Sequence, residues 1–476
     1  MARYNLAASL LLPYLAGASR SLDELTDSWQ ALPVSIPTPL SDMSVAVLDG
    51  GDAGKRVVLT GGCDSPLGNQ YMEFDGFEFF ACTSISSKAY TFSPKVPNNT
   101  FQAWTGEFEE LPDMPRERCR HASVVVGGKL CLFGGRDEND EIISEVDCYD
   151  PSADEWTTPA TLPAEYTTSD LTAFARGTDV YVVAGYDKDY VAQVQVTIVD
   201  MSDMSDIKFG PGESLLEERG DIDAAVLPDG SVYVSGGFTH ENYYEKPHNT
   251  VERYDPDTGK WSPVDSLNDE RGDKQLVSLN GKVYAIGGEA KIDITGVAPE
   301  EIPDLGAIST VLDSVEVLDP EADVHGGLAQ WRSLGGMPTA LFRFGAAEWE
   351  GEVTGEEGGD GESADDGGYI FVFGGQVAYD ADCECFRTTD QVMVFVSNCY
   401  FASPSFPWGH SPRFAEFPLT CFPLQFDHPA RTAFGQDVKK AEFTREAKPT
   451  EPSAGVGVPV ATALASCFLA VLALTT

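Results

Sequence analysis

Four arginines recur at matching places along the chain, and arginine is the side chain best suited to binding anions. Arg118 and Arg271 each stand 17 residues before the second glycine of a Gly-Gly pair, and Arg219 stands 18 residues before one. Arg343 precedes an acidic run and matches the others by its local context. A guanidinium group can donate two parallel hydrogen bonds to a carboxylate or sulfate. The set therefore predicts recognition of an anionic ligand.

Two other interpretations of these arginines stay open. The first is that they hydrogen-bond neighbouring loops and serve only the fold. The second is adhesion, because residues 219–221 and 271–273 both read Arg-Gly-Asp. That string is short, and its position is already explained by the repeat described below, so adhesion is the least favoured interpretation.

Residues that could support catalysis are sparse. The sequence contains no nucleophile elbow, no phosphate-binding loop and no calcium-loop spacing. His240 and His248 flank Glu241 and Glu245, so a surface metal site is conceivable there, but a solvated loop is favoured. We therefore predict no catalytic residue, no metal site and no cofactor. The six histidines are His121, His240, His248, His325, His410 and His428.

The arginines belong to a repeated unit that is marked by a glycine pair. The steps between the second glycines are 73, 50, 52, 51 and 87 residues, so three of the five lie near a period of 50 residues. In two units a Tyr-Asp-Pro string and a tryptophan follow, at Tyr149 with Trp156 and at Tyr254 with Trp261. The pairs are Gly61-Gly62, Gly134-Gly135, the weaker Ala184-Gly185, Gly236-Gly237, Gly287-Gly288 and Gly374-Gly375.

This combination of glycine pairs with a downstream tyrosine and tryptophan resembles the kelch-repeat family. The resemblance covers about residues 29 to 400 and implies an all-β, six-bladed propeller with four-stranded blades. It also implies that the junctions between blades, where the four arginines lie, line the mouth of a central channel. A secreted carbohydrate-active or oxidase-like enzyme that uses this channel is the alternative function. A copper radical oxidase of this architecture needs two histidines, and only His121 lies at a junction.

The local sequence agrees with a β-sheet protein. Short β-branched and aromatic runs such as residues 130–133, 232–234 and 283–286 follow tight-turn dipeptides. Examples are Asp229-Gly230 and Asn280-Gly281, which are strong hairpin signals. Residues 29–33, Trp-Gln-Ala-Leu-Pro, look like the end of a repeat unit placed before the first full unit, whereas the last unit lacks that ending. We therefore predict that an N-terminal strand completes the sixth blade and removes an open sheet edge.

Composition restricts the partners of the protein. The 476 residues contain 31 Lys plus Arg against 76 Asp plus Glu, a formal charge of −45. Such a surface repels nucleic acid and anionic lipid headgroups. We expect a protein partner or an acidic glycan, no nucleic acid, and a monomeric chain.

The two ends of the sequence predict secretion and a membrane tether. Residues 1–18 have the features of a signal peptide. The propeller then spans 19–398, a Pro/Phe-rich extension 399–438, a polar linker 439–455 and a hydrophobic tail 456–476. The tail is either a transmembrane segment or a glycolipid-anchor signal with Ser453 as attachment site. Both alternatives place the propeller at the cell surface, outside the membrane.

Cysteine usage and one glycosylation sequon agree with that compartment. Nine cysteines precede the tail, an odd number that leaves at least one thiol unpaired within the chain. Cys63 with Cys82, Cys131 with Cys148, and Cys399 with Cys421 are plausible disulfide pairs, although sequence alone does not settle the pairing. Asn98 begins the sequon Asn-Asn-Thr in a predicted loop.

Overall fold

The computed structural model of the protein describes most of the repeat region. The described residues are 28–49, 54–74, 77–95, 104–239, 246–298, 301, 303–322, 329–349 and 368–397. Asn98, the acidic run at 351–367, the Pro/Phe-rich extension, Ser453 and the hydrophobic tail lie outside them. No helix of the described part is long and apolar enough to cross a membrane.

The described residues form six four-stranded antiparallel sheets, which we call blades one to six. Blade one contains β2 (Ser44–Asp49), β3 (Lys55–Thr60), β6 (Ala89–Lys95) and β7 (Thr105–Glu110). Blade two contains β8 (Ala122–Val126), β9 (Lys129–Phe133), β10 (Glu145–Asp150) and β11 (Glu155–Thr161). Blade three contains β12 (Thr172–Arg176), β13 (Asp179–Val183), β14 (Val196–Asp200) and β15 (Lys208–Pro211). Blade four contains β16 (Asp223–Val226), β17 (Val232–Ser235), β18 (Val251–Asp255) and β19 (Lys260–Val264). Blade five contains β20 (Gln275–Leu279), β21 (Lys282–Ile286), β24 (Val315–Leu318) and β25 (Arg332–Ser333). Blade six contains β26 (Gly345–Trp349), β27 (Gly368–Phe373), β29 (Gln391–Ser397) and β1 (Ser28–Ser35).

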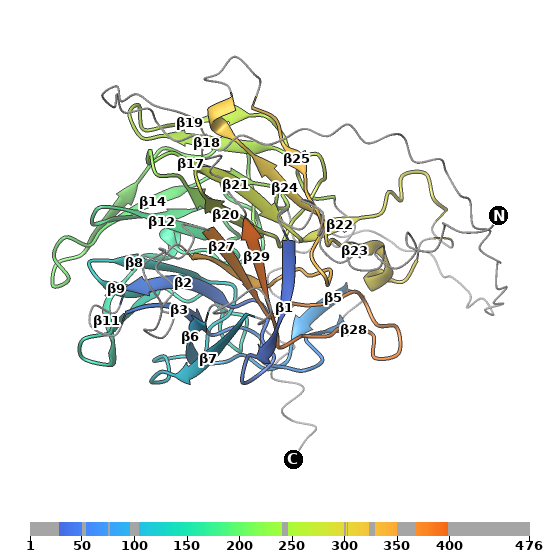
Figure 1. Cartoon of the computed structure of the whole chain (residues 1–476), viewed down its shortest axis with the longest axis horizontal. Helices are drawn as coiled ribbons and strands as arrows, with labels where there is room; N and C mark the ends of the chain where they lie inside the picture. Colours follow the sequence, from blue (N-terminus) through green and yellow to red (C-terminus); the bar gives the residue numbers. More distant parts are fainter. Residues whose placement is uncertain are drawn as a thin grey trace, which may run out of the picture.

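The six blades close into a ring through their first strands. In order, β2 contacts β8, β8 contacts β12, β12 contacts β16, β16 contacts β20, β20 contacts β26, and β26 returns to β2. Apolar side chains fill the space between blades; Val124 of blade two and Val180 of blade three, for example, share one buried cluster. The fold is therefore a closed β-propeller, as the sequence predicted (Figure 1).

The N-terminal strand completes the last blade, which confirms that prediction. β1 pairs antiparallel with β29, with Trp29 opposite Phe395 and Ala31 opposite Met393. In Figure 1 the blue β1 lies beside the orange β29. Because the two ends of the propeller share one sheet, the ring closes through backbone hydrogen bonds as well as side-chain packing.

The glycine pairs mark the points where neighbouring blades approach most closely. A Cβ on Gly134 would lie 2.2 Å from the carbonyl oxygen of Thr168 in the next blade, and one on Gly236 would lie 2.1 Å from that of Arg271. The N–H of the second glycine donates to the same carbonyl: Gly135 binds Thr168 at 3.1 Å. A side chain here would push the two blades apart, so the motif is a packing requirement.

The repeated tryptophans also join neighbouring blades. The indole N–H of Trp156 donates to Pro112, that of Trp261 to Glu213, and that of Trp331 to Asp265. Each acceptor is a backbone carbonyl that follows the outer strand of the preceding blade. The tryptophan thus supplies apolar contact area and one hydrogen bond across each of these interfaces.

The aromatic positions of the repeat are taken by other residues in blades one and three. In blade one the cross-strand aromatic pair is Phe92 with Phe108. Trp104, which directly precedes β7, packs on Tyr369 of blade six. In blade three Phe209 pairs with Val199 and so takes the register that Trp261 has opposite Tyr254 in blade four.

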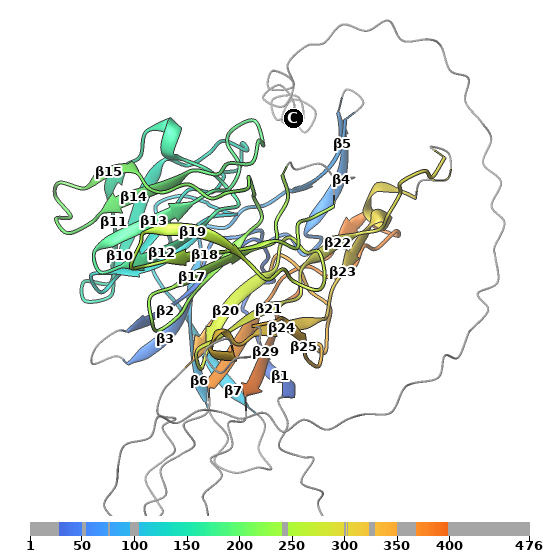
Figure 2. The same cartoon turned by 90° about the horizontal axis from the view of Figure 1, so that it is seen from above.

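The long insertions of blades one, five and six fold together at one end of the propeller. β4 (Asn69–Phe74) of blade one pairs on one side with β5 (Phe77–Cys82) and on the other with β28 (Cys385–Phe386) of blade six. Blade five adds the hairpin of β22 (Glu289–Lys291) and β23 (Ser309–Val311) and a 3-10 helix at Leu305–Ile308. We call these elements the rim; Figure 2 shows them projecting on the same side of the propeller. The rim has its own buried cluster of Phe80, Leu305, Ile308, Phe342 and Phe386.

Three disulfides lie within the described residues. Cys63–Cys82 and Cys131–Cys148 match the expected pairs, and Cys383–Cys385 was not foreseen. Cys119 is a buried free thiol, and burial raises its pKa far above the ordinary value. The expected Cys399–Cys421 pair lies outside the described residues.

The close approach at the glycine pairs predicts a difference between two Gly→Ala variants. Gly134 and Gly127 both have positive φ, 62° and 58°, but a Cβ on Gly127 meets nothing within 4 Å. Both variants incur the left-handed backbone penalty of about 1–2 kcal/mol. Gly134→Ala should cost a further 1–3 kcal/mol or so from overpacking against Thr168. Urea unfolding measures both, and equal losses would contradict the blade-contact explanation.

Candidate functional site

Three of the four predicted arginines make internal bonds that brace their own blades. Arg118 donates to the Gly134 carbonyl at 2.9 Å and to the Asp147 carboxylate at 2.6 Å. Arg219 and Arg271 make the corresponding bonds in blades four and five, to Gly236 and Glu252 and to Gly287 and Glu316. Each arginine thus ties the glycine turn of its own blade to a carboxylate on the third strand. This bond explains why each arginine stands 17 or 18 residues before the second glycine of its pair.

These three guanidinium groups are enclosed by the fold. The side chains of Arg118, Arg219 and Arg271 are 0% exposed. Burial lowers the pKa of Arg118 to about 10, with the Asp147 carboxylate opposing the shift, so the group stays charged at neutral pH. The ligand contacts expected for the three arginines are replaced in this geometry by internal hydrogen bonds.

The same burial accounts for the Arg-Gly-Asp strings. A Cβ on Gly220 would lie 2.4 Å from the ring of Tyr186, and one on Gly272 would lie 2.1 Å from the ring of Phe238. The glycine is therefore required by an aromatic side chain of the preceding blade. Since Arg219 and Arg271 are buried, the strings are not presented as adhesion motifs.

Arg343 occupies a different position from the other three. The backbone carbonyls of Arg118 and Arg271 each accept a hydrogen bond from the second glycine of the preceding blade. In blade six the carbonyl of Leu341, not that of Arg343, accepts this bond, from Gly288 at 2.8 Å. Arg343 lies two residues further on and corresponds to Arg120 of blade two. The sequence alignment by local context was therefore wrong by two residues.

Arg343 belongs to a ring of six residues, one from each blade, at the end of the central channel. Each has a positive φ between 50° and 55° and directly precedes the innermost strand region of its blade. Each N–H donates to the carbonyl of the preceding member over 2.8–3.2 Å, and Asp42 closes the circle by donating to Arg343. We call this set the channel ring: Asp42, Arg120, Asp170, Asp221, Asp273 and Arg343.

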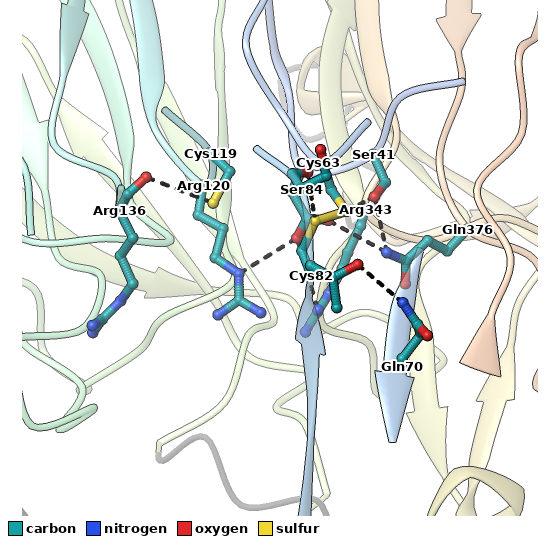
Figure 3. The surroundings of a disulfide bond; sticks show 12 residues. Ser41, Cys63, Gln70, Cys82, Ser84, Cys119, Arg120, Arg136, Arg343 and Gln376 are labelled. Carbon is teal, nitrogen blue, oxygen red and sulfur yellow. Dashed lines mark hydrogen bonds and ion pairs between the residues drawn. A yellow bond between two sulfur atoms is a disulfide. The ribbon is translucent and has the colours of Figure 1, made fainter. Parts of the chain in front are cut away.

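Ion pairs follow the channel ring around most of its circumference. Arg120 lies 3.5 Å from carboxylate oxygens of both Asp42 and Asp170. Arg343 lies 3.7 Å from Asp42 and 3.1 Å from Asp273. These five side chains are 3–11% exposed. Figure 3 shows Arg120 and Arg343 in the surroundings of the Cys63–Cys82 disulfide, at the base of the rim.

The channel behind the ring is a cavity of about 310 Å³. Its wall is made by the first strands of the blades and includes Ser44, Ser123, Asp223, Gln275 and Glu348. This volume lies at the lower end of the range for ligand pockets, roughly 300–1,000 Å³. Among the described residues, no group of three or more His, Cys, Asp or Glu side chains is arranged to hold a metal ion.

Two ionisable residues lie between blades beside the channel. His121 binds the Thr60 hydroxyl at 2.9 Å, and burial together with Arg118 lowers the pKa of His121 well below its usual value. Lys274 is 2% exposed, and its amino group has no hydrogen-bond partner among the described residues. Burial lowers the pKa of Lys274 to about 7, while Asp223 opposes the shift. His248 binds Thr239, whereas His240 lies outside the described residues.

Sequence reasoning missed the channel ring, although a signal was present. The aspartates of both Arg-Gly-Asp strings, Asp221 and Asp273, are ring members. Arg120 stands at the same distance of two residues after Arg118. The third residue of each Arg-Gly-Asp string was therefore the sequence signal for this ring.

Comparison with known families agrees with this architecture. The profile of the KLHDC2/KLHL20/DRC7 Kelch-repeats domain matches residues 67–288, which lie within the ring of blades. The chain carries a kelch-repeat propeller. The solved "Structure of YjhT" has the same fold as these kelch repeats, with a TM-score of 0.53 and 14% identity over 77% of this chain and 99% of that one.

Several curated proteins share part of the kelch region. Kelch-like protein 40 of Xenopus laevis is 28% identical over 42% of this chain and 31% of its own length. Alpha-scruin of Limulus polyphemus is 25% identical over 47% of this chain and 18% of its own length. Human Kelch-like protein 34 is 24% identical over 70% of this chain and 46% of its own length. The match therefore spans less than half of each of these relatives.

The buried ion pairs of the kelch blades predict a large loss of stability when one partner is removed. Glu316 is fully buried and accepts from Arg271 at 2.7 Å and from the backbone of Asn268. Glu316→Gln removes the buried counter-charge of Arg271, leaves only the half-exposed Asp269 at 3.4 Å, and should cost about 3–5 kcal/mol of unfolding free energy. Asp189→Asn breaks the exposed pair with Lys188 and should leave stability unchanged. Chemical denaturation of the parent and the two variants measures the losses. Similar unfolding midpoints for Glu316→Gln and Asp189→Asn would refute the proposed role of the arginines.

The buried amino group of Lys274 predicts a pH-dependent stability difference. The unfolded chain keeps this proton up to a pKa of about 10.5, but the folded chain only up to about 7, so stability rises with pH between these values. Lys274→Met should therefore stabilise the fold by about 1–3 kcal/mol below pH 7, with the gain shrinking toward pH 10. Lys260→Met, at an exposed strand position, is the control. Thermal unfolding of both variants and the parent between pH 6 and pH 10 measures the effect. A stability gain of Lys274→Met that stays the same at every pH would disprove the prediction.

Proposed function

We propose that the protein is an extracellular, membrane-tethered binding module whose rim recognises a protein partner. The observation that carries this proposal is that the three longest described insertions of the repeat fold together around one end of the channel. Binding residues are commonly placed on loops that a rigid scaffold positions. The propeller supplies that scaffold, and the rim gives its otherwise regular end a distinct surface.

The rim and the channel ring lie at the same end of the blades. Each insertion begins directly after a glycine pair, at Cys63, Glu289 and Gln376. Those residues form backbone bridges with Ser41, Gly272 and Phe342, each of which directly precedes a ring member. A partner that contacts the rim would therefore also reach the mouth of the channel.

The order within the rim supports a role in recognition. The side chains of Phe80, Phe342 and Phe386 pack with ring centroids 4.9–5.2 Å apart. A Cβ on Gly306 would collide with the ring of Tyr379, so the 3-10 helix is seated directly on blade six. Since these contacts fix the insertions before binding, a partner would meet a largely preformed surface.

Extracellular location is supported by the disulfides together with the sequence of the two ends. Three disulfides among the described residues are typical of an oxidising compartment. The predicted signal peptide and the hydrophobic tail at 456–476 support secretion and a C-terminal tether. Release of the protein from intact cells by a phosphatidylinositol-specific phospholipase would assign a glycolipid anchor, and retention would assign a spanning tail.

Partner recognition through the rim is tested with matched apolar surface positions. Leu67 and Ile292 belong to the insertions of blades one and five and are 36% and 38% exposed, whereas Phe209 on the outer strand β15 is 37% exposed. A protein captured by the full-length chain on cells should bind the Leu67→Asp, Ile292→Asp double variant at least about tenfold more weakly, because charges would enter an interface core.

The Phe209→Asp variant is the control and should retain the partner at the parental level. Quantitative binding of the purified partner to the three forms measures the effect. Equal binding by the rim variant, or capture of an acidic glycan and no protein, would contradict the proposal.

A further inference from the structure

Each member of the channel ring is followed by a side chain that reaches across the interface to the preceding blade. Cε1 of His121 in blade two lies 3.1 Å from the place that a Cβ on Gly61 of blade one would occupy. Cε of Lys274 in blade five lies 3.2 Å from the corresponding place at Gly236 of blade four. All six side chains of this kind are at most 7% exposed, and we call them the interface residues: Met43, His121, Leu171, Ile222, Lys274 and Phe344. Four of them are apolar and two are ionisable.

The two ionisable interface residues each have a buried nitrogen without a hydrogen-bond partner. Nε2 of His121 bonds the Thr60 hydroxyl at 2.9 Å, but its Nδ1 atom has no partner among the residues that the structure describes. The amino group of Lys274 has none among them either. An unsatisfied polar group is costly inside the fold, and the cost increases when the group is charged. Protonation of either residue therefore favours a state in which water reaches its nitrogen.

The charges around these two residues do not compensate for a proton in the closed ring. Burial is the largest influence on both, and it lowers the pKa of Lys274 to about 7 and that of His121 well below its ordinary value. The cation Arg118 acts on His121 in the same direction. Two carboxylates oppose the shift of Lys274 and two guanidinium groups add to it: Asp223, Asp273, Arg219 and Arg271. Both residues are thus weaker bases in the closed ring than in water.

The interfaces of His121 and Lys274 lie opposite each other in the ring of six blades. They separate blades two, three and four from blades five, six and one, because two other interfaces lie between them on either side. The second half carries the whole rim (Figure 2). The buried cluster of the rim joins Phe80 of blade one, Leu305 of blade five and Phe386 of blade six.

Side-chain hydrogen bonds join the blades of the first half. Arg136 of blade two donates to Ser169, at the start of blade three, over 2.9 Å. Tyr186 of blade three donates to Asp221, at the start of blade four, over 2.9 Å. Each half is thus connected internally, and the ionisable interface residues lie at the two borders between the halves.

We propose that the propeller opens on acidification by parting into these two halves at His121 and Lys274. Opening would bring the nitrogen of each residue into contact with water. The channel ring has one backbone bond across each border, such as that from Arg120 to Asp42 at 2.9 Å, so the ring would widen. The cavity of about 310 Å³ behind it would then open toward the rim. This goes beyond the proposed function, since it concerns a motion of the ring and does not depend on a partner at the rim.

A fall in pH drives this opening in two steps. An open ring holds the proton of Lys274 up to a pKa of about 10.5, but the closed ring only up to about 7, so the first step runs between these values. An open ring holds the proton of His121 up to a pKa of about 6.5, and the closed ring only at lower pH, so the second step begins below 6.5. Each step takes up one proton, so the ratio of open to closed molecules rises up to about tenfold per pH unit.

The second glycine of each pair is a matched reporter of every interface, since its N–H donates to a carbonyl of the next blade. Hydrogen–deuterium exchange of the full-length protein is measured at these amides by mass spectrometry from pH 5 to pH 10 and divided by the intrinsic exchange rate at each pH. Gly62 and Gly237, at the two borders, should both show the two steps. The four amides within the halves should show neither step: Gly135, Gly185, Gly288 and Gly375.

The repeat itself supplies a substitution for each border residue. Met43 and Leu171 stand at the equivalent position in other blades, which gives Lys274→Met and His121→Leu. Lys274→Met should remove the step between pH 10 and pH 7 at both borders, and His121→Leu the step below pH 6.5, because the halves part as units. Lys260→Met, at an exposed position, should retain both steps. If His121→Leu does not fold, His121→Gln also lacks a titrating ring and should remove the same step.

Four results would overturn the proposal. One is that the corrected exchange at Gly62 and Gly237 does not change with pH. Another is an equal rise at all six glycine amides, which would be a general loosening of the fold. A third is a step that persists in the variant designed to remove it. The fourth is that each variant changes exchange at its own border alone, which would mean that the two interfaces open independently.

Discussion

The close contact between a glycine pair and the backbone of the next blade is the constraint on which this structure depends. At Gly236 a Cβ would lie about 2 Å from the Arg271 carbonyl, and the N–H of Gly237 donates to that same oxygen. The contact fixes how far apart two blades stand and where the following chain begins its first strand. The channel ring is the direct result, because each of its members starts from a chain segment anchored in this way.

The buried arginines act through the same turns. Arg271 donates from its side chain to the glycine turn of its own blade, while its carbonyl accepts from the turn of the preceding blade. One residue thus joins two adjacent blades, and Glu316 neutralises its charge within the fold. In blade six Leu341 stands at this position, so that junction keeps only the backbone half of the arrangement. A buried charge is tolerated here since hydrogen bonds and a counter-charge surround it.

The repeat and its departures have different roles. Strands with matching register and the tryptophan contacts make the blades alike, whereas the rim and the channel ring make one end of the propeller unlike the other. Function is carried by sites and not by the fold, and the non-repeating features are where this propeller differs from a regular one. The ring also concentrates four acidic and two basic side chains at one end of the propeller.

The sequence by itself determined the strands, the six blades and the closure by β1, because those depend on local patterns that repeat at a readable spacing. Trp29 and the glycine pairs carry that information in the residues themselves. Only the tertiary structure decided what the arginines do, since burial of Arg219 and the two-residue offset of Arg343 depend on contacts between blades. It also decided that the backbone of Asp221 bonds to those of Asp170 and Asp273, because residues about 50 positions apart become neighbours only when the ring closes.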